Sequence, residues 1–320
     1  MKGKIDINRL YSGVWVKVVA VYISVVLLWS TTPLAIKWSN ESFSFIAAVS
    51  LRMFMACALA LLLLALLQRP LFSVKGAWKV YAVASLGLFP AMPLVYWAAQ
   101  YISSGMLALI FAMTPIATGV LSIFILRENP FTVVKLLALL LAIAGLVVIF
   151  GDQVVLGSNA GLGVLAALGA CSIMGGSSVL LKSLAQQSQQ IGSLQQTTGA
   201  LLFAVPALFL TWGLAWYFGD DPWLQQVSDK SLWAIAYLTL FGSLLGFTFY
   251  YYLLRNISPI SLSLVTLITP VLALYLGHWL DSEIISARLL WGAAMIVVAL
   301  GFYQGVSPLK LLRSHKGVTR

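Results

Sequence analysis

Residues 103–128 read SSGMLALIFAMTPIATGVLSIFILRE, and residues 258–283 read SPISLSLVTLITPVLALYLGHWLDSE. Each stretch contains an uncharged, largely apolar run that is long enough to cross the roughly 30 Å hydrocarbon core of a bilayer as an α-helix. The whole chain has this character, because 61% of its residues are hydrophobic and only 9% are charged, whereas soluble proteins use about 25% charged residues. The apolar runs are continuous rather than alternating, which predicts an all-α integral membrane protein and argues against a β-barrel.

The two quoted stretches align with each other without a gap. They share a Thr-Pro pair and a glutamate thirteen residues after the proline, which are Thr114-Pro115 with Glu128 and Thr269-Pro270 with Glu283. This combination is hard to obtain by chance, even in a leucine-rich chain. The alignment therefore predicts an internal repeat.

Working outward from these stretches, the apolar runs predict ten membrane-spanning helices. Their expected bounds are 16–37, 43–67, 77–99, 104–126, 132–150, 160–182, 194–217, 232–254, 259–280 and 287–305. The connections are short, the longest being about 218–231, and we expect no soluble domain.

The basic residues set the expected orientation of the spans. Counted with the N-terminus in the cytoplasm, fifteen Lys and Arg fall on the cytoplasmic side, and the three on the other side are Lys37, Lys230 and Arg288. This bias predicts that both termini are cytoplasmic and that the number of spans is even. The net charge of +10 is accordingly assigned to orientation and to contact with anionic lipid headgroups, not to nucleic acid.

The repeat divides the chain into two halves of five spans, residues 1–151 and residues 152–320 with its basic cytoplasmic tail. Because five is odd, the second half enters the membrane from the opposite face, and the repeats are inverted. Inverted repeats place a solute-binding site near the bilayer midplane, between the halves. We therefore expect one membrane domain of ten helices that transports a small solute.

The sequence resembles the drug/metabolite transporter superfamily, EamA type. The resemblance is carried by the order and spacing of LLWSTTPLAIKW (27–38), SLRMFMACALALLLL (50–64) and the two stretches quoted first. It implies a ten-helix carrier of the bacterial inner membrane that exports amino acids or related metabolites. One departure is that Ser30-Thr31 follow Trp29 where the family usually has a glycine, whereas Gly175-Gly176 are retained in the second half.

Polar and aromatic side chains inside the spans are the candidate substrate-binding residues. They would form an uncharged, hydrogen-bonding pocket for an amphipathic metabolite. These candidates are Trp29, Ser30, Thr31, Tyr96, Thr114, Ser177, Tyr251 and Thr269. The alternative is that such side chains hydrogen-bond to neighbouring helices and only hold the bundle together.

Pro115 and Pro270 are the candidate gating residues, because they lie mid-span at equivalent repeat positions. A proline removes one backbone hydrogen bond and can kink its helix, which would open the helix beside the cavity. The alternative is a tolerated packing kink, since proline is common in membrane helices.

Three charged residues are candidates for structural or ion-pairing roles: Arg52, Glu128 and Glu283. Arg52 lies within a span, where it could pair with a substrate carboxylate or with the carbonyls of a broken helix, or make a fixed structural contact. The family pattern often has arginine here whatever the solute, which favours the fixed contact. The glutamates follow spans 104–126 and 259–280, where a carboxylate can cap the start of the next helix.

These observations predict a secondary transporter that works by alternating access. No carboxylate falls clearly in the middle of a span, so exchange or downhill movement fits better than an evident proton relay. The sequence has no HExxH, GxSxG, Walker or Cys/His metal motif, and we expect no enzyme activity, cofactor or metal. The expected partners are a small-molecule substrate and the bilayer. The alternatives are a channel or a non-transport protein such as a sensor or assembly subunit.

Overall fold

The structure, a computed structural model, describes residues 7–128, 131–150, 159–219, 227–256 and 265–303, and this part of the chain contains helices and no strand. The helices of the first half are α1 (Ile7–Ser39), α2 (Phe45–Leu66), α3 (Ala77–Ser85), α4 (Ala91–Ala98), α5 (Ser104–Phe111), α6 (Thr114–Ile125) and α7 (Val133–Phe150). Those of the second half are α8 (Ala160–Ser183), α9 (Ala185–Gln190), α10 (Ser193–Tyr217), α11 (Asp229–Tyr237), the π-helix η1 (Leu238–Leu245), α12 (Gly246–Asn256), α14 (Val265–Asp281) and α15 (Ala287–Tyr303).

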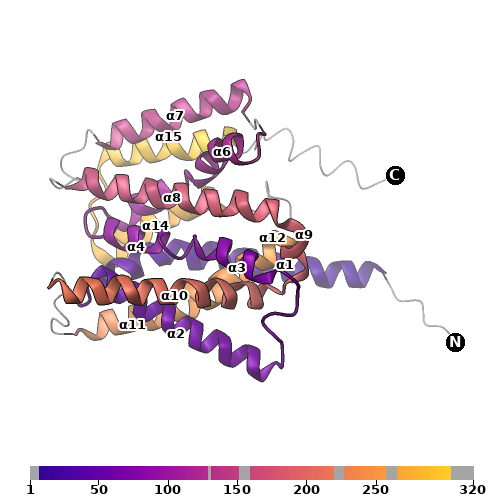
Figure 1. Cartoon of the computed structure of the whole chain (residues 1–320). Coiled ribbons are helices and arrows are strands. Elements are labelled where there is room, and N and C mark those ends of the chain that lie inside the picture. The colour runs from indigo at the N-terminus through magenta and orange to yellow at the C-terminus, as the bar shows by residue number, and fades with distance from the viewer. Residues whose placement is uncertain (1–6, 129–130, 151–158, 220–226, 257–264, 304–320) are drawn as a thin grey trace, which may run out of the picture.

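The helices form one bundle in which most of them run along a common direction (Figure 1). Six helical segments are long and apolar enough to cross a membrane, and α7 and α15 supply shorter apolar segments. The six segments are Val16–Ser39, Phe45–Leu66, Ser104–Ile125, Ala160–Ser183, Ser193–Tyr217 and Asp229–Asn256. The expected span 259–280 lies partly outside the described residues and is represented by α14.

The expected continuous helix 77–99 is wrong in detail, because it is divided into α3 and α4. Pro90 has no N–H to donate, and it stands as the residue before the first turn of α4. The expected span 104–126 agrees with the single membrane-length segment Ser104–Ile125, within which a short turn separates α5 from α6. Thr114-Pro115 lie in the first turn of α6. Pro270, the repeat counterpart of Pro115, instead lies inside the continuous helix α14.

Large apolar side chains cover the outside of the bundle. Phe124, Val133, Trp233 and Trp291 are all exposed, whereas the interior is filled mainly by alanine and aliphatic side chains. Such a surface is suited to lipid rather than water, because apolar side chains are compatible with the hydrocarbon core of the bilayer. The helices meanwhile satisfy their own backbone hydrogen bonds, which the hydrocarbon core cannot do. The chain is therefore a multi-pass membrane protein.

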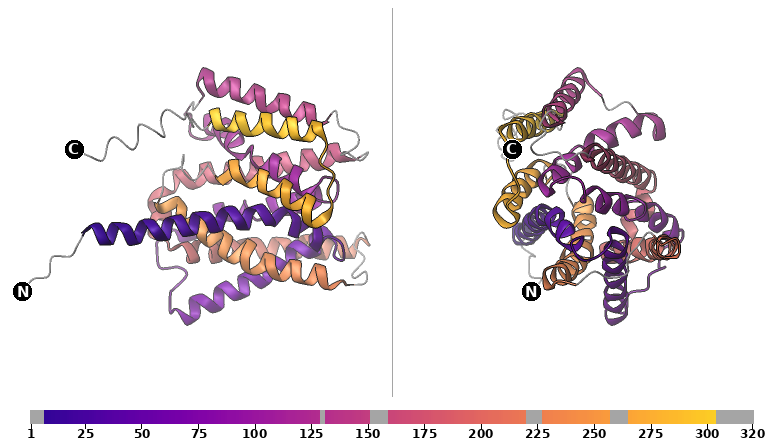
Figure 2. Two further views of the ribbon diagram at one scale, coloured as in Figure 1. Left: turned by 180° about the vertical axis from the view of Figure 1, so that it is seen from behind. Right: turned by 90° about the vertical axis from the view of Figure 1, so that its left-hand side faces the viewer.

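Helices α7 and α15 pack side by side at one edge of the bundle (Figure 2). Two glycines allow this approach. A Cβ atom on Gly292 would lie 2.6 Å from the carbonyl oxygen of Gly145, and one on Gly145 would lie 2.8 Å from that of Gly292. Small residues at helix crossings are a common means of close packing in membranes.

We predict that Gly292→Ala lowers the thermal stability of the protein in detergent, because the added methyl group collides with the backbone of α7. Overpacking of this kind costs about 1–3 kcal/mol. Gly301→Ala in the same helix is the matched control, since nothing lies within 4 Å of its added Cβ. Equal melting temperatures for the two variants would contradict the close packing of α7 and α15.

Candidate functional site

A cavity of about 400 Å³ lies inside the bundle. Its wall is built by α1, α2, α3–α4, α5–α6, α8, η1–α12 and α14, and no residue of α7, α10 or α15 contributes to it. The residues that line it include Trp29, Thr32, Ile36, Arg52, Phe111, Thr114, Pro115, Thr118, Ser177, Ser178, Leu181, Gly242, Phe247, Tyr250, Tyr251, Leu254 and Thr269. The cavity is therefore shared by the two halves of the chain.

Aromatic rings form much of the wall. The ring of Trp29 lies 5.2 Å from that of Tyr250, and Tyr250 lies 5.5 Å from Tyr251, measured between ring centroids. Phe111 and Phe247 add two further rings. A cavity with these surfaces suits the apolar or aromatic body of an organic solute.

The hydroxyl groups of the wall are engaged with helix carbonyls. Thr114 donates to the carbonyl of Phe111 at 2.5 Å, Thr118 to that of Thr114 at 2.8 Å, and Ser177 to that of Val83 at 2.7 Å. A hydroxyl that donates its proton keeps acceptor lone pairs. These side chains can therefore accept hydrogen bonds from N–H or O–H groups of a solute.

The structure brings together five of the eight candidate substrate-binding residues at the cavity. Trp29, Thr114, Ser177, Tyr251 and Thr269 line it. Of the two candidate gating prolines, Pro115 also lines it, and Pro270 is not among the lining residues.

Ser30, Thr31 and Tyr96 lie away from the cavity wall. Ser30 is buried and donates to the carbonyl of Val26, and the hydroxyl of Thr31 hydrogen-bonds to that of Tyr237 at 2.5 Å. Tyr96 is fully buried beneath Arg52. Because they follow Trp29 directly, Ser30 and Thr31 point to other faces of α1.

Thr32, Thr118 and Ser178 also line the cavity and are absent from the residues predicted from the sequence. Helical spacing could have found Thr32 and Thr118, since residues three or four apart share a face of a helix. Thr32 follows Trp29 by three residues, and Thr118 follows Thr114 by four.

Arg52 is buried, with 1% of its surface exposed, and its side chain reaches the cavity wall. Its Nε donates to the hydroxyl of Ser243 in η1 at 2.7 Å, and its Nη1 donates to the hydroxyl of Tyr96 at 3.2 Å. The guanidinium carbon also lies 5.8 Å from the centroid of the Tyr96 ring. Arg52 thus joins α2 to α4 and η1.

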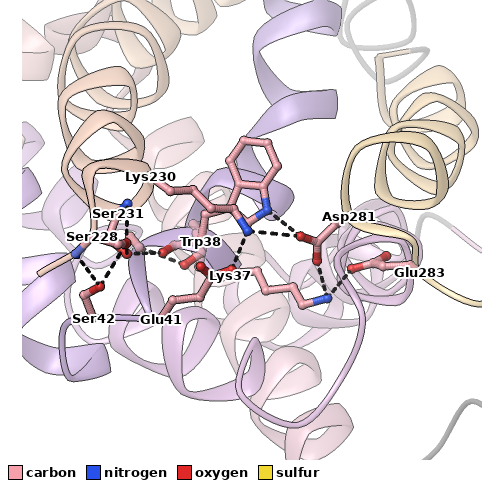
Figure 3. A network of polar contacts seen from close by, with 11 residues as sticks. Lys37, Trp38, Glu41, Ser42, Ser228, Lys230, Ser231, Asp281 and Glu283 are labelled. Atoms are coloured by element: carbon pink, nitrogen blue, oxygen red, sulfur yellow. Dashed lines mark hydrogen bonds and ion pairs between the residues drawn. The ribbon is translucent and has the colours of Figure 1, made fainter. Parts of the chain in front are cut away.

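A network of charged side chains joins α1, α11 and α14 at one end of the bundle (Figure 3). The Nζ atom of Lys37 lies 2.7 Å from Asp281 and 3.0 Å from Glu283. Lys230 pairs with Glu41 at 2.7 Å and with Asp281 at 3.3 Å. Asp281 also accepts a hydrogen bond of 2.7 Å from the indole of Trp38. We call these residues the Lys37 network.

Glu283 is the most buried acid of the Lys37 network, with 6% of its side chain exposed. It accepts hydrogen bonds from the backbone N–H and the hydroxyl of Ser104, at 2.9 and 3.0 Å, and from the N–H of Gly105. A carboxylate at this position satisfies the free N–H groups of a helix start and suits the helix dipole. The helix it caps is α5, which is distant in sequence, and not the next helix along the chain.

At the opposite end of the bundle, Lys182 and Glu128 form an ion pair of 2.6 Å. Both side chains are exposed, at 63% and 60%. In the predicted repeat, Glu128 corresponds to Glu283, and Lys37 and Lys182 each end the first expected span of their half, 16–37 and 160–182. In each pair the lysine comes from one half of the chain and the glutamate from the other.

The fold is that of a helical membrane protein with an internal cavity, and comparison with known proteins identifies its family as one of transporters. The EamA-like transporter family matches residues 16–151 and 161–303. The chain belongs to this family, within the drug/metabolite transporters.

Two relatives match along most of the chain. An uncharacterized transporter of Buchnera aphidicola subsp. Schizaphis graminum is 23% identical over 297 residues, which covers 90% of this chain and 97% of that protein. Protein PagO of Salmonella typhimurium is 24% identical over 279 residues, covering 85% of this chain and 88% of that protein.

The chain also matches part of a third relative and shares its fold with a solved structure. The uncharacterized inner membrane transporter YedA of Escherichia coli K12 is 38% identical over 76 residues, which is 22% of this chain and 24% of YedA. One solved crystal structure superposes with a TM-score of 0.61 at 20% identity, covering 91% of this chain and 98% of that chain. At this identity the likeness shows a shared fold.

We predict that Lys37→Met destabilises the protein more than Lys182→Met does. The first change leaves the buried Glu283 without its cation, which costs about 1–3 kcal/mol. The second removes an exposed pair of the kind that contributes less than about 1 kcal/mol. Thermal unfolding of the two variants in the same detergent measures the difference. A larger loss of stability for Lys182→Met would show that the Lys37 network does not hold the bundle together.

Proposed function

We propose that this protein is a secondary transporter of small organic solutes, such as amino acids or related metabolites, that works by alternating access. The observation that carries the proposal is the central cavity, which is lined by both halves and flanked by two repeat-related Lys–Glu pairs at opposite ends. A channel would need a continuous polar lining, whereas much of this wall is aromatic and aliphatic.

Helix packing supports two inverted halves, residues 1–151 and 152–320, of five spans each. Helix α1 packs on α14, and α8 packs on α6. Each of these contacts is the repeat equivalent of the other, because α1 corresponds to α8 in the predicted repeat and the α5–α6 span corresponds to α14. The contacts of α2 with α10 and of α7 with α15 join repeat mates directly. Such packing is the arrangement that allows two mirror-related states.

The charged pairs suggest which state the structure represents. The cavity reaches Ile36, one residue before Lys37, where the partly buried Lys37 network joins three helices. It also reaches Leu181 and Leu254, near the exposed Lys182–Glu128 pair. We therefore assign the Lys37 network as the closed gate and the Lys182–Glu128 end as the more open gate.

The distribution of positive charge indicates which side of the membrane the closed gate faces. Arg69, Lys75, Lys79 and Arg255 all belong to the same end as Lys182, which the positive-inside rule assigns to the cytoplasm. The proposed state is accordingly inward-facing, with both termini cytoplasmic. The relative YedA is named an inner membrane transporter, which favours the same membrane for this chain.

The interrupted helices offer places where the bundle can bend. The α5–α6 break lies beside Pro115, and η1 is a π-helix within the span from α11 to α12. Irregular segments of this kind are frequent at functional sites and hinges. In the proposed cycle they adjust as the Lys37 network separates and the Lys182–Glu128 pair becomes enclosed.

The residues of the cavity favour exchange or downhill movement, with export as the proposed direction. Among the described residues, no Asp or Glu lines the cavity, so its wall offers no carboxylate for a coupling proton. The carrier would need no enzymatic step and no bound cofactor. Its energy source would be the gradient of the solute itself or of an exchanged solute.

We predict saturable counterflow by the purified protein in liposomes. Vesicles loaded with a pool of amino acids, amines, nucleosides and sugars should release one chemical class faster than protein-free vesicles, with mass spectrometry as the readout. Release should accelerate when the same solute is present outside, because the loaded carrier reorients in both directions. A flux that neither saturates nor shows counterflow would identify a channel, and the absence of selective flux would contradict transport.

We also predict that Asp281→Asn opens the gate formed by the Lys37 network. In right-side-out vesicles, this change should raise by about tenfold the rate at which a membrane-impermeant maleimide labels the Ile36→Cys variant. A tenfold change corresponds to a loss of about 1.4 kcal/mol in the free energy that favours the closed gate. Glu128→Gln at the other end should leave the rate unchanged or lower it. The native Cys57 and Cys171 are both buried, so the parent protein provides the blank. An unchanged rate of labelling at Ile36→Cys in the Asp281→Asn variant would contradict the assignment of the Lys37 network as the closed gate.

A further inference from the structure

Arg52 is a buried cation that has no acidic partner in the described part of the chain. The ion pairs of these residues involve Lys37, Lys182 and Lys230, and none involves Arg52. Among the described residues that line the cavity, Arg52 is also the only charged one. In the described part of the bundle, Arg52 therefore places at the cavity wall a positive charge that is almost fully covered by protein and lacks an acidic partner.

An unpaired charge inside a membrane protein requires an explanation, because removal of a charged group from water costs several kcal/mol unless an opposite charge compensates it. The neutral hydroxyls of Ser243 and Tyr96 accept from two of the five N–H donors of the guanidinium. Neither hydroxyl neutralises the charge. An anionic group in the cavity would supply the missing compensation.

Gly242 in η1 leaves room for the guanidinium of Arg52. A Cβ atom on Gly242 would lie 2.9 Å from Nη2 of Arg52, so the absence of a side chain lets the guanidinium lie against this helix. Gly242 is itself part of the cavity wall. Ser243, the next residue, fixes the Nε side of the guanidinium.

We propose that Arg52 binds a carboxylate of the transported solute, and this inference rests on the proposed function. A single cation suits a singly charged carboxylate better than a phosphate with two negative charges. The rings of Trp29 and Tyr250 provide the surface for an apolar or aromatic body next to it. The proposed substrate class is thus small organic carboxylates with an apolar or aromatic side chain, including amino acids of that kind.

The alternative is that Arg52 only connects α2, α4 and η1. A purely structural role predicts that changes at Arg52 alter stability and leave the choice between solutes as it was. A binding role predicts a change in that choice. Matched solutes that differ only at the carboxylate therefore separate the two roles.

The experiment uses the full-length protein in detergent and a set of carboxylates, each paired with its carboxamide. The pairs are 3-phenylpropanoate with 3-phenylpropanamide, L-phenylalanine with L-phenylalaninamide, and L-leucine with L-leucinamide. We expect at least one carboxylate to raise the melting temperature in a saturable manner at neutral pH. Its amide should bind about tenfold more weakly or worse, because hydrogen bonds between charged groups are the strong ones.

Variants of the same chain provide the controls. Arg52→Gln should remove the preference for the carboxylate, whereas Arg69→Gln, which removes an exposed arginine just after α2, should retain it. Gly242→Ala provides a second test that keeps the charge. Its added methyl group meets the movable end of Arg52, so the protein should fold while the preference falls.

The outcomes separate this inference from the proposed function. Carboxylate preference that survives both Arg52→Gln and Gly242→Ala, or a complete lack of stabilisation by the carboxylates, overturns the role of Arg52. Counterflow of solutes without regard to a carboxylate also overturns it and leaves the transporter intact. Arg52-dependent binding without counterflow supports the binding role and contradicts transport.

Discussion

Backbone hydrogen bonding inside a bilayer is the constraint on which the rest of this structure depends. An unpaired N–H or C=O costs several kcal/mol in hydrocarbon, so the chain crosses as helices, and breaks are tolerated only where protein or a polar cavity satisfies the backbone. Among the described helices, the interrupted or irregular spans are α3–α4, α5–α6 and α11–η1–α12, and all three contribute residues to the cavity wall. The same constraint therefore produces the continuous outer helices and concentrates irregular backbone around the proposed solute site.

The two halves share a sequence pattern but differ in their contacts, and transport offers a physical reason for the difference. Pro115 starts a new helix, whereas Pro270 lies within a continuous one. Lys37 pairs with the buried carboxylate of Glu283, whereas Lys182 pairs with an exposed one. A bundle of inverted repeats that is closed at one end and open at the other must hold equivalent residues in unequal environments. In the mirror-related state, these environments would be exchanged.

The sequence was sufficient to predict the helical membrane fold, the family, and several of the residues that line the cavity. Apolar runs reveal the depth of a residue in a span, which is why Trp29, Thr114 and Thr269 were found. Depth does not reveal the rotation of a helix about its axis, which depends on packing. Tyr96 and Tyr251 are separated by 155 residues, the same offset as Pro115 and Pro270 in the predicted repeat, yet of the two only Tyr251 lines the cavity. The cap that Glu283 places on α5 was likewise hidden, because it joins residues that are remote in sequence.

Tyr96 provides a physical connection between Arg52 at the cavity wall and the end of the bundle that carries the Lys37 network. Its hydroxyl accepts a hydrogen bond from Arg52, and its carbonyl accepts one of 2.8 Å from the side chain of Asn40. Asn40 follows directly on the end of α1, next to Lys37 and Trp38 of the Lys37 network. A ligand shifts a conformational equilibrium only by its difference in affinity for the two states. A solute carboxylate that draws Arg52 from Tyr96 would create such a difference at the side chain that joins the cavity to the gate, so that binding and gate movement share one set of contacts.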